Sequence, residues 1–130
     1  MTEYKPEDYI KYRIELARGT IEEVKTHIKN KFWNTAINRM YYACFYAVGA
    51  LLLKNNIAVS SHPGVRQKFG EHFVKTGIIE RDLAKHFTEL FEKRHKGDYN
   101  DFFDFDEDTV LRLYPHSIEL VERIEQIIEE

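Results

Sequence analysis

The residues best suited to chemistry lie together near position 94. Arg94 and His95 stand side by side in a basic run, and Asp98 and Tyr99 follow closely. An arginine can clamp a phosphate through two parallel hydrogen bonds, and a histidine exchanges protons near neutral pH. The alternative is structural, because cations at the C-terminus of a helix offset its dipole. The pattern therefore predicts either a phosphate-binding site or a helix cap.

A second polar pair, Asn38-Arg39, interrupts an otherwise apolar and aromatic run over residues 36–53. An arginine on so apolar a segment is rarely buried without a partner. The pair predicts one of two arrangements. Arg39 either forms a structural ion pair, with Asp98 as one candidate partner, or points from the core toward a functional groove.

Two spacings resemble metal sites without completing them. Glu92 and His95 match the Glu-x-x-His spacing of di-iron bundles, but those sites need two such motifs and two further glutamates. Asp104, Asp106 and Asp108 alternate like the start of a calcium loop, yet the required glycine and the closing glutamate are absent. Capping of the next helix by Asp106 or Asp108 explains these acids better. We predict no metal site and no cofactor.

These clusters need a scaffold, and the run over residues 36–53 supplies its centre. A segment that is apolar on nearly every side is normally the buried helix of a bundle, and its Ala, Leu and Met content favours helix over strand. The helix is expected from about Phe32 to Lys54 or Asn55. Gly49 within it usually marks the close approach of a neighbouring helix.

Four further helices are predicted from apolar residues at spacings of three and four. Their expected ranges are about 7–27, 63–75, 80–96 and from 106 or 108 to the C-terminus. Ser60 or Ser61 is the expected cap of the third helix, with Pro63 in its first turn. Gly97 is the predicted end of the fourth helix, and Pro115 should kink the last helix or delay its start. The sum is an all-α fold, an antiparallel bundle of about five helices in one domain spanning residues 1–130.

The composition predicts a soluble, cytoplasmic chain. Its 43% hydrophobic content is enough for a core, and a single cysteine, Cys44, excludes an intramolecular disulfide. No uninterrupted apolar run approaches 18 residues, so no membrane span is expected. Residues 1–75 carry 12 basic and 7 acidic side chains, whereas residues 76–130 carry 7 and 15. This asymmetry reflects either scattered solvated faces or separate faces for an anionic ligand and a basic partner.

Three runs of sequence together resemble the HEPN domains (higher eukaryote and prokaryote nucleotide-binding). The central helix reads A-x-N-R-x-Y-Y-A-x-F-Y-A, the next helix opens with S-S-H-P-G-V, and the fourth ends in R-H-K-G-D-Y. The likeness covers about residues 7–128 and is greatest to small stand-alone prokaryotic HEPN proteins. It implies an antiparallel helical bundle, commonly a two-fold homodimer. Many members are encoded beside a minimal nucleotidyltransferase and form a toxin–antitoxin pair with it.

The resemblance also implies an activity. Active HEPN ribonucleases carry an arginine followed four to six residues later by a histidine, both facing a cleft at the dimer interface. Arg94 matches that arginine, which would steady the scissile phosphate, and the histidine would act as general acid or base. Here Tyr99 stands where the histidine is expected, and a tyrosine that is protonated at neutral pH is a poor base. His95 can substitute only if the helix end turns it into the same cleft.

Three functions follow from these observations. The first is a HEPN-fold dimer that partners a nucleotidyltransferase and binds nucleotide or RNA phosphate in a cleft around Arg94. The ligand-binding residues expected in that case are Asn38, Arg39, Arg94 and Asp98. The second is a metal-independent endoribonuclease toxin that uses Arg94 with His95 or Tyr99. The third is a non-catalytic helical interaction domain.

Overall fold

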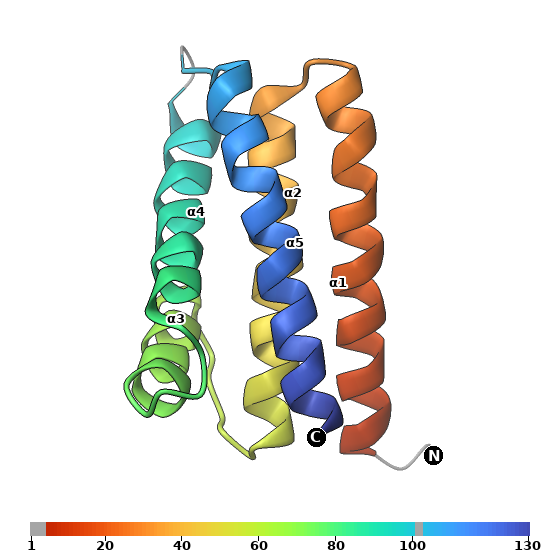
Figure 1. Ribbon diagram of the computed structural model, residues 1–130, viewed down its shortest axis with the longest axis vertical. Helices are drawn as coiled ribbons and strands as arrows, with labels where there is room; N and C mark the ends of the chain where they lie inside the picture. The colour runs from red at the N-terminus through yellow and green to blue at the C-terminus, as the bar shows by residue number, and fades with distance from the viewer. Residues whose placement is uncertain (1–4, 101–102) are drawn as a thin grey trace.

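The computed structural model describes residues 5–100 and 103–130. Within these ranges the chain forms five α-helices and one π-helical turn, and no strand. The helices are α1 (Pro6–Lys29), α2 (Trp33–Lys54), α3 (His62–Phe69), α4 (Arg81–Tyr99) and α5 (Glu107–Glu129), and the π turn, Gly70–Val74, directly follows α3. Figure 1 shows the four long helices running alongside one another, with α3 at one end of the bundle. The predicted all-α antiparallel bundle is confirmed.

The helix α2 is the centre of the bundle and packs against α1, α4 and α5. Its buried residues include Ile37, Met40, Tyr41, Cys44, Val48 and Leu51, and the opposite face of the helix is partly buried. Of the described helices, α2 is the one long and apolar enough to cross a membrane, but 61% of that apolar window is buried inside the protein. Packing within the bundle therefore accounts for its composition.

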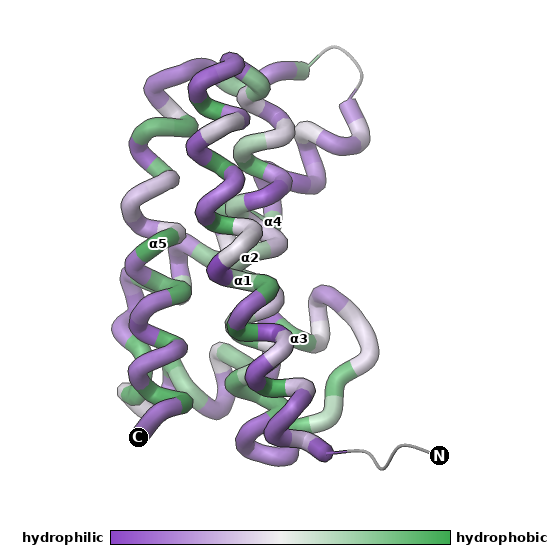
Figure 2. The backbone as a smooth tube through the Cα atoms, turned by 90° about the vertical axis from the view of Figure 1, so that its right-hand side faces the viewer, coloured by the Kyte–Doolittle hydropathy of each residue, from purple (hydrophilic) through white to green (hydrophobic). Residues whose placement is uncertain are grey.

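The helices α1 and α5 cover α2 with one apolar stripe each, and Figure 2 shows hydrophobic and hydrophilic residues alternating along both. Asp106 caps α5 as predicted, its carboxylate accepting a hydrogen bond from the Thr109 amide at 2.8 Å. The helix then begins at Glu107 and continues through Pro115, so the proline does not delay its start. Pro115 has no N–H, so the carbonyl of Leu111 receives no hydrogen bond from it within the helix. Leu111 is 46% exposed, so water can donate to this carbonyl instead.

The helix α3 is shorter than predicted, because its α-helical hydrogen bonding ends at Phe69 and a π turn follows. The apolar residues of this segment, Val65, Phe69 and Phe73, are spaced by four residues. In an α-helix, side chains at this spacing turn gradually around the axis and leave a common face. The wider π turn offsets the drift and keeps Phe73 buried, at 4% exposed. The predicted cap is confirmed, since the Ser61 hydroxyl accepts from the Gly64 amide at 3.0 Å.

Two glycines behave differently from prediction. Gly97 does not end α4, which continues to Tyr99. A Cβ at Gly97 would lie 3.1 Å from the Phe105 ring and 3.4 Å from Asn34 Cγ, so this glycine allows the close approach of α4 to its neighbours. A Cβ at Gly49 would meet only the Arg13 guanidinium, at 3.7 Å, which is an ordinary contact. The neighbour at Gly49 is therefore a side chain from α1.

Candidate functional site

The helices α2 and α4 bring the two predicted polar clusters together. Asn38 Nδ2 donates to both carboxylate oxygens of Asp98, at 3.2 and 3.1 Å. Arg39 Nε and Nη2 donate to Asn38 Oδ1 at 3.0 and 2.7 Å. Arg94 Nη1 lies 3.5 Å from Asp98 Oδ2. The four side chains form one network, in which Asn38 stands between Arg39 and Asp98 in place of the ion pair that the sequence suggested.

Arg94 is the enclosed cation of this network. Its side chain is 10% exposed, and its Cζ atom lies 4.9 Å from the centroid of Tyr41, 5.6 Å from that of Tyr42 and 6.0 Å from that of Phe91. Its Nε is buried and has no hydrogen-bond partner within the described residues. Aromatic faces stabilise a guanidinium without filling its donor sites, and 3.5 Å is long for a charge-assisted hydrogen bond. Arg94 therefore keeps donor capacity for an anion.

Two further arginines lie against the same aromatic rings. Arg39 Cζ is 5.0 Å from the centroid of Tyr42, and Arg66 Cζ is 4.3 Å from that of Phe91. Among the ion pairs of the described residues, the one that involves any of these three arginines is Arg94 with Asp98. Three cations against one carboxylate leave a local positive excess on a chain whose net charge is −3. We call Arg39, Arg66 and Arg94 the arginine cluster.

His62, which no sequence pattern singled out, lies beside the arginine cluster. His62 is the first residue of α3, and its Nδ1 is 2.7 Å from the hydroxyl of Tyr41. Its ring stacks on Phe45 with centroids 4.3 Å apart and an angle of 13°. Burial lowers the pKa of His62, and the charge of Arg94 lowers it further. The S-S-H-P-G-V run contained this residue, but no spacing in the sequence connects position 62 with position 94.

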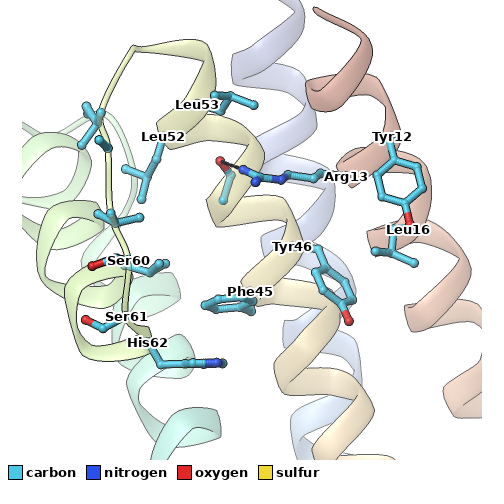
Figure 3. Close-up of a pocket in the computed structure, with 15 residues that line it drawn as sticks. Tyr12, Arg13, Leu16, Phe45, Tyr46, Leu52, Leu53, Ser60, Ser61 and His62 are labelled. Atoms are coloured by element: carbon cyan, nitrogen blue, oxygen red, sulfur yellow. Dashed lines mark hydrogen bonds between the residues drawn. The ribbon is translucent and has the colours of Figure 1, made fainter. Parts of the chain in front are cut away.

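An open groove of about 530 Å³ lies on the other side of His62. Figure 3 shows it between α1, α2 and the segment that leads into α3. Its walls are mainly apolar and aromatic and include Tyr12, Leu16, Phe45, Tyr46, Leu52, Leu53 and Val59. Arg13 reaches across from α1, and its Nη1 donates to the Gly49 carbonyl at 3.3 Å. No acid of the described residues forms an ion pair with Arg13, so the groove combines apolar walls with an available cation.

His95 and Tyr99 contact each other, with ring centroids 4.7 Å apart. Tyr99 is 72% exposed and His95 is also exposed. Within the described part of the chain, neither forms a hydrogen bond or an ion pair with the network around Arg94. Their catalytic role stays a prediction.

The comparisons with known proteins agree with this architecture. The family model of the HEPN domain matches residues 10–128. A protein of Thermotoga maritima named UPF0332 protein is 37% identical over 124 residues, which cover 95% of this chain and 94% of that protein. A protein of Methanocaldococcus jannaschii that bears the name "Putative toxin" is 32% identical over 117 residues, which cover 90% of this chain and 87% of that one. The resemblance seen in the sequence is thus confirmed, and the chain belongs to the HEPN domain family.

Proposed function

We propose that this HEPN protein binds the phosphates of RNA or of a nucleotide at the arginine cluster. The observation that carries the proposal is the state of Arg94, which is almost enclosed and rests on three aromatic rings, and whose Nε has no hydrogen-bond partner among the described residues. A phosphate supplies the charge and the acceptors that the protein leaves unfilled. RNA is favoured over a free nucleotide, because aromatic rings beside cations suit the successive bases of a single strand.

The test is the affinity for a single-stranded RNA oligonucleotide, measured by fluorescence anisotropy at one fixed salt concentration. Arg94→Ala is expected to weaken binding by about tenfold to a hundredfold, because it removes a charge-assisted pair of hydrogen bonds. Arg94→Lys should give an intermediate loss, since it keeps the charge without the planar fork.

The matched control is Arg112→Ala. Arg112 is an exposed arginine on α5 that pairs with Glu89, and its loss should change the RNA affinity by less than about twofold. Equal affinities of the wild type and a folded Arg94→Ala variant would reject RNA binding at this site. The chain would then be better described as a non-catalytic interaction domain.

We further propose that the protein is a cytoplasmic homodimer that pairs with a nucleotidyltransferase, in the manner of a toxin–antitoxin system. The family resemblance and the name of the Methanocaldococcus relative support this part of the proposal. Light scattering of the purified chain should give about twice the chain mass of 15.5 kDa, and a co-expressed nucleotidyltransferase should co-purify with it. A single-chain mass at micromolar concentration would contradict the dimer.

Metal-independent cleavage of RNA at the same site is the second candidate function. The observation that favours it is an imidazole, that of His62, against the same aromatic rings as the Arg94 guanidinium. A phosphate clamp and a proton-transfer group are the two parts that such a reaction needs.

A further inference from the structure

We propose that His62 is the proton-transfer residue of a metal-independent site that cleaves single-stranded RNA and uses Arg94 as its phosphate clamp. The inference rests on the proposed function, since RNA must bind at Arg94 before His62 can act on it. It moves the catalytic role away from His95 and Tyr99, the residues that the sequence suggested.

The imidazole of His62 is held in one orientation. Its face stacks on Phe45, and its ring lies nearly perpendicular to that of Tyr42, at 88°. Its Nδ1 is hydrogen-bonded to the Tyr41 hydroxyl. Its Nε2 forms no hydrogen bond or ion pair with any residue that the structure describes. One nitrogen held by an orienting group and the other left for substrate is the arrangement that a general base requires.

Tyr41 is suited to be that orienting group. Its ring is fully buried, and burial raises its pKa to about 12 against the opposing effect of Arg94. Its hydroxyl is therefore protonated at neutral pH, and a hydroxyl can accept from Nδ1–H of His62 as well as donate to it. In the tautomer with the proton on Nδ1, a lone pair stays on Nε2. The lowered pKa of His62 keeps the ring neutral at pH 7.

His62 and Arg94 both lie against the rings of Tyr41 and Tyr42, which brings the two groups within reach of one bound strand. The imidazole centroid is 5.9 Å from the centroids of both Tyr41 and Tyr42. Arg94 Cζ is 4.9 Å and 5.6 Å from those same centroids. The two groups also interact electrostatically, since the charge of Arg94 contributes to the lowered pKa of His62.

The groove beside His62 indicates the class of substrate. Figure 3 shows Phe45 and His62 at one end of this groove, and Arg13 reaches into it from α1. Phe45, Tyr46 and Tyr12 offer aromatic faces on which unpaired bases can stack, and Arg13 offers a cation to the backbone. A base pair is too wide and too rigidly stacked to place one nucleotide in such a groove. The substrate is therefore single-stranded RNA.

The reaction needs no metal and no co-reactant. The ribose 2′-hydroxyl attacks the adjacent phosphorus, so that an O2′–P bond forms while the P–O5′ bond breaks. The 2′-hydroxyl proton passes to Nε2 of His62 and later to water, and the leaving O5′ takes a proton from water. Arg94 offsets the charge that builds on the non-bridging oxygens. The products are a 2′,3′-cyclic phosphate and a 5′-hydroxyl end.

The experiment is cleavage of a single-stranded RNA oligonucleotide in the presence of EDTA, with the ends of the products identified by mass spectrometry. The wild type should yield cyclic phosphate ends, and a strand with 2′-deoxyribose throughout should stay intact. His62→Gln should lower the cleavage rate by about a hundredfold or more, with RNA affinity by anisotropy unchanged within about twofold. The matched control is His72→Gln, at an exposed histidine of the π turn, which should cleave at the wild-type rate. His95→Gln tests the rival catalytic residue.

A second variant tests the role of Tyr41 as a positioning residue. Tyr41→Phe keeps the buried ring, so it should lower kcat, leave KM unchanged and shift the acid limb of the pH–rate profile. The charged and titratable groups that face His62 are Arg94, Tyr41, Tyr42 and, across the groove, Arg13.

The outcomes separate the inference from the proposed function. Cleavage lost in His95→Gln and kept in His62→Gln would overturn the inference, as would an RNA-binding wild type that never cuts. In both of those cases the proposed function stands. A wild type that does not bind RNA would overturn both.

Discussion

Phe87→Ala is expected to lower the free energy of unfolding by about 3–5 kcal/mol, the usual cost of removing a buried phenylalanine. Phe87 is 1% exposed. Its ring stacks against Tyr41 at 5.8 Å with an angle of 7° and meets Phe69 edge-on at 5.7 Å. Tyr41 contacts both Arg94 and His62, so the cavity that Phe87→Ala leaves beside Tyr41 should also weaken RNA binding. Chemical denaturation followed by circular dichroism measures the first effect, and anisotropy measures the second.

Phe32→Ala is the matched control for this variant. Phe32 is 57% exposed and precedes α2, so its loss should cost less than about 1 kcal/mol. A loss below about 1 kcal/mol for Phe87→Ala as well would mean that α4 does not pack on α2 as described.

The stability of the protein is expected to fall by about 3 kcal/mol between pH 7 and pH 4 because of one buried histidine. His86 is 7% exposed, and its Nε2 is 2.9 Å from Ser117 Oγ. The Ser117 hydroxyl donates its one proton to the Leu113 carbonyl, so Oγ accepts from Nε2–H of a neutral imidazole. Burial, with a smaller contribution from His116, lowers the pKa of His86 to about 4.

The sign follows from proton uptake. Between pH 6.5, the ordinary histidine value, and pH 4, the unfolded chain binds a proton that the folded chain does not, so stability is full above pH 6.5 and declines below it. Glu89 opposes the lowered pKa and Arg112 adds to it. Urea unfolding of His86→Gln at several pH values should lose this part of the dependence, and His95→Gln should retain it. Parallel curves for wild type and His86→Gln would contradict the assignment.

The fold was predictable because its strongest signal is local. The central helix is apolar on nearly every side, and each surrounding helix has one apolar stripe. An antiparallel bundle is the simple way to bury the apolar surface of all of them. The caps at Ser61 and Asp106 were also local, because each depends on a side chain and an amide three residues away. Gly97 was misread for the opposite reason, since its role depends on Phe105 and Asn34, which reach it only through tertiary packing.

The candidate site was predictable in Arg39 and Arg94, but not in Arg66 or in its histidine. Asn38 and Arg39 stood out as polar residues on an apolar helix, and Arg94 stood out in a basic run beside His95. His62 stood in a run of turn residues, and its contacts with Tyr41 and Phe45 depend on how α3 packs against α2. A pattern of spacing along one helix cannot connect residues that belong to different helices.

RNA binding at Arg94 can be followed through the Nε–Hε signal of Arg94 in nitrogen-15 NMR, recorded as single-stranded RNA is added to the labelled protein and assigned with Arg94→Lys. Because Arg94 Nε has no hydrogen-bond partner in the part of the chain that the structure describes, its signal should shift with the RNA and saturate at the affinity measured by anisotropy, while the Arg112 signal stays in place. Binding seen by anisotropy without any change at Arg94 would place the RNA elsewhere and contradict a phosphate site at the arginine cluster.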